Sequence, residues 1–312
     1  MQASDRIYVA GHTGMVGTAI CRELKSRGYQ NLITVGHREL DLTEQAVTRA
    51  FIQRERPDCI IFAAARVGGI EANRSLIGTF LYENLMASAN VIHAAHEAGV
   101  KRLLFLGSTC IYPRLAPQPI PEESLLTGPL EPTNEGYALA KIFAMKLCEY
   151  IQKEDSRFEY KTLIPCNLYG EHDKFAPEHS HLIPAIIHKI HLAKVNGLSK
   201  VEIWGDGKAR REFMLASDLA DCVMTCVEQF SKVPNLMNVG LGFDYSVNEF
   251  YQTAAKVIGY QGEFYHDLSK PTGMQQKLVS VSRLTEFGWK PKTTLADGMK
   301  KTYEFYLKQF NE

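Results

Sequence analysis

The sequence lacks the features that mark several large classes of protein. Lysine plus arginine and aspartate plus glutamate each number 35, so the chain has no excess charge of either sign. It therefore has no global field to attract nucleic acid or an anionic membrane, and an anionic ligand must be held by local basic groups. No run of about 18 apolar residues occurs, and the start, MQASDRIYVAGHTG, has no apolar signal core. These absences predict a cytoplasmic protein.

Cysteine is present, but in no recognisable framework. The seven cysteines are scattered and include no CxxC pair, which argues against a disulfide scaffold and a thiolate zinc site. Four histidines do lie near one another in the sequence: His179, His181, His188 and His191. No carboxylates or thiols complete a metal site around them, so the sequence predicts no bound metal.

What the sequence does contain is an alternation of strand and helix patterns. Its 312 residues, 45% hydrophobic and 22% charged, suit a globular chain with one large α/β unit and a smaller lobe. Short apolar runs alternate with stretches in which apolar residues recur at helical spacing. This alternation predicts a doubly wound parallel sheet of the Rossmann type, with helices on both faces. The predicted strands are 7–10, 32–35, 59–63, 103–107 and 162–165, and the predicted helices are 15–27, 43–55, 75–98 and 137–150.

The pattern loosens after Gly170, which predicts a boundary there. We expect the Rossmann domain over 1–170 and a smaller α/β lobe over 171–312, built mainly from 171–230 and 260–295. The segment 231–259 is expected to return to the main sheet. Within the second part, a helix is predicted at 182–194 and strands at 201–204 and 236–239.

A glycine motif lies between the first predicted strand and helix. Gly11, Gly14 and Gly17 have the spacing GxxGxxG. The first permits a tight turn, the second lets backbone N–H groups approach a pyrophosphate, and the third lets the helix pack on the strand. Turns use glycine anyway, but the strand–turn–helix context predicts a dinucleotide site. The other expected contacts in this loop are Thr13, Met15 and Val16.

The end of the second predicted strand selects the cofactor. An NAD site usually places an acid there for the ribose 2′-hydroxyl, whereas this chain has Gly36, His37 and Arg38. A guanidinium suits a 2′-phosphate, so Arg38 or His37 predicts NADP(H); the alternative is that both are solvated surface residues. Asp41 and Leu42 are expected at the adenine edge.

A tyrosine and a lysine with catalytic potential follow later in the chain. Tyr137 and Lys141 share one face of a predicted helix. A neighbouring ammonium lowers the pKa of a phenol, which could then pass a proton to a carbonyl that receives hydride. This spacing is common by chance. Ser108, directly after the strand at 103–107, strengthens the case, because strand ends in such sheets face the ligand crevice.

With these residues the chain resembles the extended short-chain dehydrogenase/reductase superfamily. The matching parts are the glycine loop, Ala63 to Ala65, Gly107 to Thr109 and Tyr137 to Lys141. Finer motifs resemble the GDP-L-fucose synthase family almost from end to end. They are AARVGGI at 64–70, STCIYP at 108–113, EPTNE at 131–135, NLYG at 167–170, HDKF at 172–175, SH at 180–181, WG at 204–205 and REF at 211–213.

The resemblance implies a specific reaction. That family epimerises C3 and C5 of GDP-4-keto-6-deoxy-D-mannose and then reduces the C4 ketone with NADPH. Inversion at carbon needs a base on one face and an acid on the other. The resemblance assigns these roles to Cys110 and His181, since a thiol and an imidazole both transfer protons near neutral pH. Without the family motifs, Cys110 would be read as a buried inert thiol and His181 as a surface or capping histidine.

The resemblance also implies binding residues and an assembly. A lysine and an arginine suit a diphosphate, and an indole can stack on a base or a sugar. A homodimer is implied, with helices 75–98 and 137–153 pairing into a four-helix bundle. The implied cofactor residues are Ala63, Ala64, Ala65, Leu106, Gly107, Lys141, Pro165, Cys166, Asn167, Leu168 and His181, and the implied substrate residues are Lys189, Trp204, Arg211 and Thr272.

Four positions depart from the family pattern and leave two alternatives open. Thr13, His37 and Lys189 stand where arginine is frequent, and Thr272 stands where an acid contacts the substrate. The substrate could therefore be another GDP-4-keto-sugar, including a deoxyheptose. A non-catalytic NADP-binding sensor is an alternative of a different class, and the presence of both Tyr137 and Lys141 argues against it.

Overall fold

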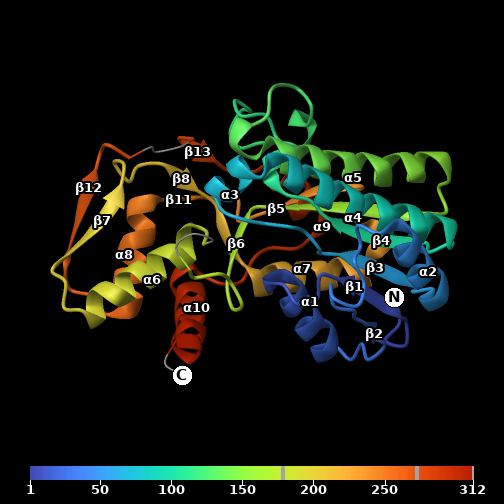
Figure 1. Ribbon diagram of the computed structural model, residues 1–312, viewed down its shortest axis with the longest axis horizontal. Helices are drawn as coiled ribbons and strands as arrows, with labels where there is room; N and C mark the ends of the chain where they lie inside the picture. Colours follow the sequence, from blue (N-terminus) through green and yellow to red (C-terminus); the bar gives the residue numbers. More distant parts are fainter. Residues whose placement is uncertain (177–179, 271–273, 311–312) are drawn as a thin grey trace.

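The computed structural model describes residues 1–176, 180–270 and 274–310. Its centre is a parallel six-stranded sheet with the order β10-β5-β4-β3-β1-β2 (Figure 1). This confirms the predicted Rossmann-type α/β fold and the predicted return of the segment near 236–239 to the main sheet. The strands are β1 (Ile7–Ala10), β2 (Leu32–Ile33), β3 (Cys59–Phe62), β4 (Arg102–Leu106), β5 (Glu159–Pro165) and β10 (Leu236–Val239).

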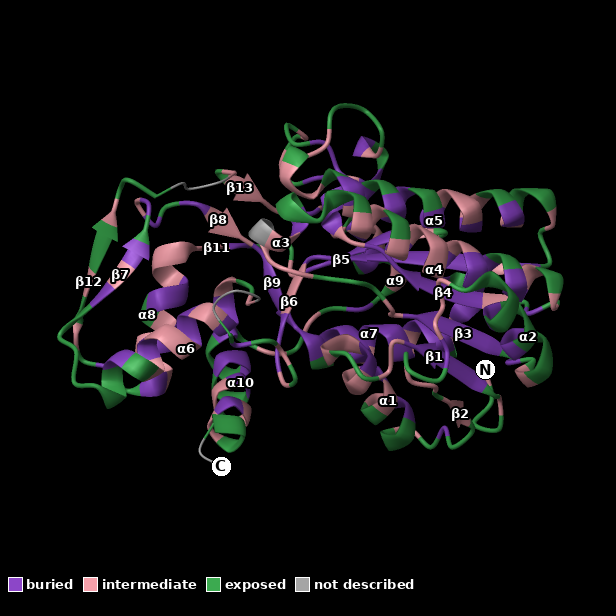
Figure 2. Ribbon diagram, viewed as in Figure 1, coloured by how far each residue is buried: buried purple, intermediate pink, exposed green. Residues whose placement is uncertain are grey.

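The central strands β1 and β3 are apolar throughout because both faces of the sheet are covered. In β1, Ile7 and Val9 join one buried cluster, while Tyr8 and Ala10 join another on the opposite face. Side chains alternate across a strand, so a sheet between two helical layers needs apolar residues at every position. Figure 2 shows the sheet buried, with exposed residues on the outer sides of the helices.

Two layers of helices cover this sheet. One layer, packed on Ile7 and Val9, contains α1 (Met15–Ser26), α7 (Ala216–Glu228) and α9 (Ser282–Phe287). The other, packed on Tyr8 and Ala10, contains α2 (Gln45–Glu55), α4 (Ile77–Glu97) and α5 (Glu135–Glu154). In the described ranges, no helix is both long and apolar enough to span a bilayer.

Local geometry shifts three predicted boundaries. The helix predicted over 75–98 is α4, which begins at Ile77 because Leu76 adopts a non-helical φ of −123°; the short helix α3 (Ile70–Ser75) before it was not predicted. The helix predicted from 43 starts at Gln45, since the backbone N–H of Thr43 donates to Asp41 Oδ1 in a turn. β2 ends at Ile33 rather than at residue 35.

The second lobe has its own apolar core around α6 (Leu182–Val195), α8 (Val247–Ile258) and α10 (Leu295–Phe310). It also contains the parallel pair β7 (Lys200–Trp204) and β12 (Glu263–Asp267). Short strands lie between the lobes. They are the pair β6 (Asn167–Tyr169) and β9 (Phe213–Leu215), and a small sheet of β8 (Arg210–Arg211), β11 (Tyr245–Ser246) and β13 (Gln276–Lys277).

The division of the chain between the lobes differs from the prediction at two helices. α7 falls in the segment 171–230 that was assigned to the second lobe, but its buried face, including Leu219 and Val223, packs with α1 on the main sheet. α8 falls in the segment expected to return to that sheet, but Phe250 and Ala254 pack in the second lobe. The chain crosses between the lobes more often than its helical pattern indicates.

Candidate active site

The glycine loop connects β1 to α1 and leaves no room for a side chain at Gly11 or Gly17. Gly11 has a φ of +85°, and a Cβ atom there would lie 2.7 Å from the Cα of Ala64. A Cβ on Gly17 would overlap the carbonyl oxygen of Gly11. Gly14 is the N-cap of α1, whose first turn contains no acidic residue. A bare backbone turn at an acid-free helix N-terminus fits the pyrophosphate of a dinucleotide.

The residues expected at the adenosine end follow β2. His37 is 81% exposed, and its Nδ1 lies 4.0 Å from Oδ1 of Asp41. Thr43 donates to Asp41 from its backbone N–H and its hydroxyl, which lowers the pKa of that carboxyl. Arg38 is exposed and forms no ion pair within the described ranges. Its guanidinium is thus free to meet a phosphate, and that role stays a prediction.

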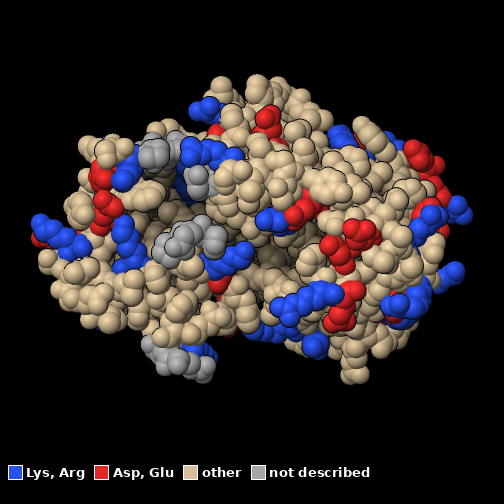
Figure 3. Space-filling model, viewed as in Figure 1, with Lys and Arg blue, Asp and Glu red and all other residues tan. Residues whose placement is uncertain are grey.

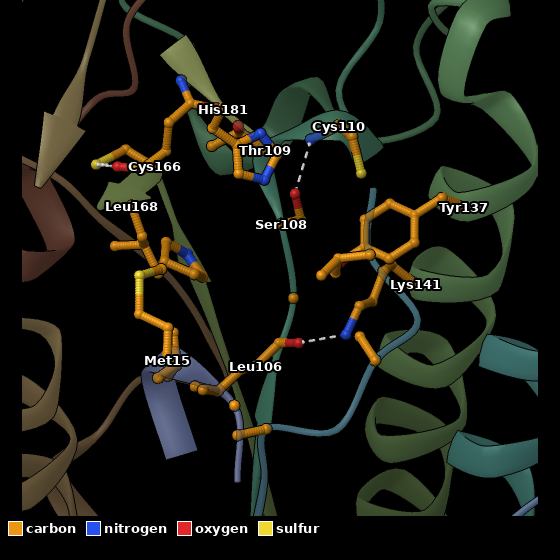
Figure 4. Close-up of a pocket in the computed structure, with 18 of the residues that line it drawn as sticks. Met15, Leu106, Ser108, Thr109, Cys110, Tyr137, Lys141, Cys166, Leu168 and His181 are labelled. Carbon is orange, nitrogen blue, oxygen red and sulfur yellow. Dashed lines mark hydrogen bonds between the residues drawn. The ribbon is translucent and has the colours of Figure 1, made fainter. Parts of the chain in front are cut away.

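A cavity of about 340 Å³ opens between the carboxyl edge of the main sheet and the second lobe. The five residues expected to be catalytic all line it: Ser108, Cys110, Tyr137, Lys141 and His181 (Figure 4). Of the expected cofactor residues, it is also lined by Gly14, Met15, Val16, Gly17, Ala63, Ala65, Leu106, Gly107, Pro165, Cys166, Asn167 and Leu168. It is not lined by Gly11, Thr13, His37, Arg38, Asp41, Leu42 or Ala64.

Tyr137 and Lys141 come from the first turns of α5. Lys141 is buried, and its Nζ donates a 2.9 Å hydrogen bond to the carbonyl oxygen of Leu106. Burial lowers the pKa of Lys141 to about 8. Burial also raises the pKa of Tyr137, although the lysine neighbour alone predicted a lower value. The loss of water around the phenolate raises the pKa of Tyr137 more than the Lys141 ammonium, 5.7 Å from the ring centre, lowers it. The phenol therefore stays protonated, which is the form that can donate a proton.

Ser108 and Cys110 belong to the short turn that follows β4. Ser108 caps the 3₁₀ helix η1 (Thr109–Ile111), and its Oγ accepts a 3.4 Å hydrogen bond from the backbone N–H of Cys110. Burial raises the pKa of the Cys110 thiol, while Lys277, Ser108 and Lys141 oppose the rise. The turn thus places a hydroxyl and a thiol at the end of a buried strand, facing the cavity.

His181 reaches the same cavity from the second lobe. It is the N-cap residue of α6, with extended backbone. Its side chain is accessible to solvent, yet the walls around it and the charge of Lys174 lower its pKa. Figure 4 shows His181 on one side of Ser108 and Cys110 with Tyr137 on the other. Two groups able to transfer protons therefore stand on different sides of one cavity, as inversion at a carbon requires.

Four polar residues of the cavity were not predicted as site residues: Asn73, Thr109, Asn134 and Lys277. Asn134 ends the 3₁₀ helix η3 (Pro132–Asn134) before α5, and its Oδ1 is buried without a hydrogen-bond partner. Its place in the EPTNE motif was the signal that could have identified it. Lys277 belongs to β13, far along the chain from Cys110. It had no such signal, because β13 reaches the site only by pairing with β8.

Three of the expected substrate residues, Lys189, Trp204 and Arg211, lie outside the cavity lining. Lys189 Nζ donates a 2.6 Å hydrogen bond to the carbonyl oxygen of Glu202, and Trp204 Nε1 donates to the Glu202 carboxylate at 2.8 Å. Trp204 is 59% exposed. Arg211 is the strand partner of Lys277, and burial lowers the pKa of Arg211. Thr272 lies outside the described residues.

Basic side chains gather on this side of the molecule. Figure 3 shows Lys and Arg along the rim of the hollow between the lobes. A chain of zero net charge thus still offers a local basic surface to an anionic ligand.

The described residues contain no group of three or more His, Cys, Asp or Glu side chains that could hold a metal ion. Two of the histidines considered as ligands have other partners. His188 Nδ1 is 2.9 Å from the Tyr306 hydroxyl, and His191 Nδ1 is 3.0 Å from the Tyr303 hydroxyl. These contacts attach α6 to α10. His179 lies outside the described ranges.

Comparison with known proteins agrees with this arrangement. A family model described as the NAD dependent epimerase/dehydratase family matches residues 7–240. GDP-L-colitose synthase of Yersinia pseudotuberculosis is 49% identical over 306 residues, covering 98% of this chain and 99% of that protein. GDP-L-fucose synthase of Escherichia coli (strain K12) is 44% identical over 313 residues, covering 98% and 97%.

A solved structure extends the likeness to three dimensions. GDP-mannoheptose C4 reductase from Campylobacter jejuni, with NADP bound, has a TM-score of 0.90 and 34% identity, covering 98% of this chain and 99% of that one. The chain therefore belongs to the NAD dependent epimerase/dehydratase family of extended short-chain dehydrogenases, within the group that contains the GDP-L-fucose and GDP-L-colitose synthases.

Proposed function

We propose that this protein converts GDP-4-keto-6-deoxy-D-mannose to GDP-L-fucose, by epimerisation at C3 and C5 followed by NADPH-dependent reduction of the C4 ketone. One observation carries the proposal: a single cavity contains Ser108, Tyr137 and Lys141 together with Cys110 and His181. The first three suit reduction of a ketone, and the last two suit proton exchange at the carbons beside it. Reduction of a ketone does not by itself require the Cys110 thiol as a base.

The cofactor of the proposed reaction is NADPH, which supplies the hydride when it is bound. Support comes from the fit of the glycine loop to a pyrophosphate and from the absence of an acid at the tip after β2. The Campylobacter jejuni reductase structure contains NADP. We assign the pyrophosphate to the loop around Gly14 and Gly17, the 2′-phosphate to Arg38, and the nicotinamide end to Asn167 and Leu168.

Cys110 and His181 perform the proposed epimerisation. The Cys110 thiolate takes the proton from a carbon beside the ketone, and the C–H electron pair moves onto the carbonyl oxygen. Hydrogen bonds from Ser108 and Tyr137 stabilise that oxyanion. The His181 imidazolium then returns a proton on the other face, leaving a thiol and a neutral imidazole that re-equilibrate with solvent. The same sequence at the second carbon completes the inversion.

Tyr137 completes the reduction by giving its proton to the C4 oxygen. The raised pKa keeps the phenol protonated until that oxygen becomes basic. Lys141 holds its place through Leu106 and presents its charge beneath the tyrosine ring. We assign the diphosphate of the substrate to Arg211 and Lys189 and the sugar or base to Trp204, since each offers the matching chemistry on the second lobe.

A second candidate substrate comes from the relatives. The relative at 49% identity is named a GDP-L-colitose synthase, and the reductase of similar structure acts on a GDP-mannoheptose. This chain also departs from the family pattern at Lys189 and Thr272. A GDP-linked precursor of L-colitose, or a GDP-4-keto-heptose, is therefore the alternative, and it would use the same cavity.

We further propose a homodimer formed through α4 and α5. These helices lie side by side on one face of the main sheet (Figure 1). They expose five large apolar or aromatic side chains: Ile77 at 41%, Tyr82 at 61%, Leu139 at 42%, Phe143 at 39% and Tyr150 at 51%. Two copies related by a twofold axis would cover these side chains as a four-helix bundle. Sedimentation of the wild-type chain and of Phe143→Glu, expected as dimer and monomer, tests this arrangement.

We also assign the protein to the cytoplasm. All seven cysteines are free. Free thiols persist in a reducing compartment, which is also where an NADPH-dependent enzyme finds its cofactor.

The proposed function is tested by NADPH absorbance. Addition of GDP-4-keto-6-deoxy-D-mannose to enzyme and NADPH should cause a loss of absorbance that is stoichiometric with substrate. A GDP-4-keto-heptose and the GDP-linked precursor of L-colitose are compared at equal concentration, and the highest kcat/KM identifies the substrate. A binding sensor would retain NADPH but leave the absorbance unchanged with all three sugars.

A further inference from the structure

Lys277 places a positive charge in the reaction cavity, and neither the epimerisation nor the reduction described above gives that charge a role. It lines the same space as Cys110, Tyr137 and His181. Within the described ranges its ammonium has no hydrogen bond and no carboxylate within ion-pair distance. Water is scarce around it, and burial lowers its pKa. A half-buried lysine without a partner costs stability, so its place in this cavity calls for a functional explanation.

The backbone on both sides of Lys277 is held firmly, although β13 has only two residues. The contacts come from side chains of three other segments. Gln276 Nε2 donates to Asp244 Oδ2 at 2.6 Å, the Leu278 N–H donates to Gln118 Oε1 at 2.7 Å, and the Val279 N–H donates to Glu212 Oε2 at 3.1 Å. These hydrogen bonds fix the backbone from which the Lys277 side chain extends. A site that holds its groups in place before substrate binds is supported in this way.

Glu212 is the most buried of these anchors. Burial raises its pKa to about 7, against the lowering by three backbone N–H donors. Its oxygens accept from Leu241, Gly242 and Val279, so it joins the loop after β10 to the segment after β13. Glu212 therefore sets the position of Lys277 relative to the end of the main sheet.

Two cations among the charged and titratable groups around Cys110 favour its thiolate, and the effect of Lys277 is the larger. The other is Lys141, on α5, whose Nζ also donates to the Leu106 carbonyl. His181, before α6, has its pKa lowered by burial and by Lys174. Arg211, on β8, and the carboxylate of Glu131 both act on Lys277, but Glu131 is paired with Arg114 at 3.5 Å. The remaining neighbours, Ser108 and Tyr137, are neutral. Lys277 and Cys110 interact reciprocally: each charge favours the other.

We propose that Lys277 stabilises the thiolate of Cys110, the form that removes a proton beside the C4 ketone. Lys277 acts through Cys110 and is thus a positioning residue of the epimerisation. In that step the C–H bond breaks, the S–H bond forms, and the electron pair moves to the C4 oxygen, while Lys277 keeps its own proton. The catalytic part of this inference rests on the proposed function; the pairing of charges does not.

The first experiment measures the thiolate directly, without substrate. The rate of Cys110 alkylation by iodoacetamide is followed against pH and read from the mass of the Cys110 peptide, so the other six cysteines do not interfere. Lys277→Met and Lys277→Gln remove the charge, Lys277→Arg keeps it, and Lys256→Met removes an exposed charge on α8 as the matched control. NADPH binding and thermal unfolding verify that each variant is folded.

We expect the midpoint of alkylation to rise by about one pH unit or more in both neutral variants, because a nearby opposite charge favours the ionised form by that amount. Lys277→Arg should restore the wild-type midpoint, and Lys256→Met should not move it. An unchanged midpoint in both Lys277→Met and Lys277→Gln overturns the proposal, whatever the substrate of the enzyme is.

The second experiment connects the thiolate to epimerisation. Deuterium uptake from solvent at C3 and C5 of GDP-4-keto-6-deoxy-D-mannose, without NADPH, should require a correspondingly higher pH in Lys277→Met. Oxidation of the C4 hydroxyl of GDP-L-fucose with NADP⁺ needs Tyr137 but no thiolate, and it should stay within about threefold of wild type. An equal loss of deuterium uptake and of C4 oxidation in Lys277→Met would mean that Lys277 has only a structural role. Absence of both reactions in the wild-type protein would instead overturn the proposed function.

Discussion

The two walls of the reaction cavity are built in different ways. The sheet wall carries Ser108, Cys110, Tyr137 and Lys141, all from the stretch between the end of β4 and the second turn of α5. The lobe wall takes His181 from the start of α6 and Lys277 from β13, two segments far apart in the chain. Helices and a buried strand hold the first wall, whereas side chain-to-backbone hydrogen bonds such as those of Glu212 hold the second.

This difference separates the chemistry from its adaptation to a substrate. Groups on the sheet wall are placed by the fold shared by the whole family, so we expect changes there to abolish steps of the reaction. Groups on the lobe wall and around it are placed by local contacts that can vary without loss of the sheet. We expect changes there to alter which sugar binds, how tightly, and at which pH.

The largest effect should follow Tyr137→Phe. Loss of the proton donor should lower the rate of ketone reduction by about a thousandfold or more, within the range known for general acids. NADPH affinity, measured by fluorescence titration, should stay close to wild type, since the ring remains. Turnover within tenfold of wild type would remove Tyr137 from its proposed role.

Cys110→Ser should separate the two reactions carried out on the sheet wall. A serine hydroxyl is a far weaker base than a thiolate, so deuterium exchange at C3 and C5 should fall by about a hundredfold or more. Reduction of the C4 ketone should persist and give a sugar that is not inverted. Undiminished exchange in this variant would transfer the base role to another group.

The pH dependence of ketone reduction should show the lowered pKa of the buried Lys141. Its pKa is lowered to about 8, so the ammonium is present below that pH and is lost as the pH rises through it. The rate of ketone reduction should therefore fall above about pH 8, approaching tenfold per unit. Measurement of kcat/KM from acid to alkaline pH tests for this decrease. A rate that stays level up to the ordinary pKa of lysine would show that the ammonium is not needed.

Arg211→Met should weaken the binding of the nucleotide sugar and leave the cofactor site and the reaction steps unaffected. Removal of a guanidinium from a diphosphate contact should raise KM for the nucleotide sugar by about tenfold, equivalent to the loss of one charge-assisted hydrogen bond. The affinity for NADPH and the rate constant at saturating sugar should change little. A fall in kcat with an unchanged KM would place Arg211 among the reacting groups instead.

The smallest effect should follow Arg38→Ala, at the outer end of the cofactor. Arg38 is exposed, so loss of its contact with the 2′-phosphate should weaken NADPH several-fold and leave NADH unaffected. Binding of both cofactors by isothermal titration measures the ratio. An equal change for NADPH and NADH would remove Arg38 from the 2′-phosphate site.

The sequence allowed more of the sheet wall to be predicted than of the lobe wall. The glycine loop, Ser108 and the Tyr137–Lys141 pair are recognisable because their chemistry depends on local spacing along the chain. Lys277 had no such pattern, since its position arises from the pairing of β13 with β8 and from the contacts of Glu212.

Two other results depend on burial, which no local pattern contains. The pKa of Tyr137 moves opposite to the direction that its lysine neighbour indicated, because the phenol is enclosed. The helices α7 and α8 have similar amphipathic sequences but cover different cores, α7 beside α1 and α8 in the second lobe. Which core an amphipathic helix covers is decided by tertiary packing, not by its own periodicity.

One measurement tests the central claim most directly, that one cavity performs both proton exchange and reduction. GDP-4-keto-6-deoxy-D-mannose is converted by the enzyme with NADPH in D₂O, and the product is examined by NMR. We predict GDP-L-fucose with deuterium at both C3 and C5. A 6-deoxy-D-hexose product with hydrogen retained at both carbons would contradict the account.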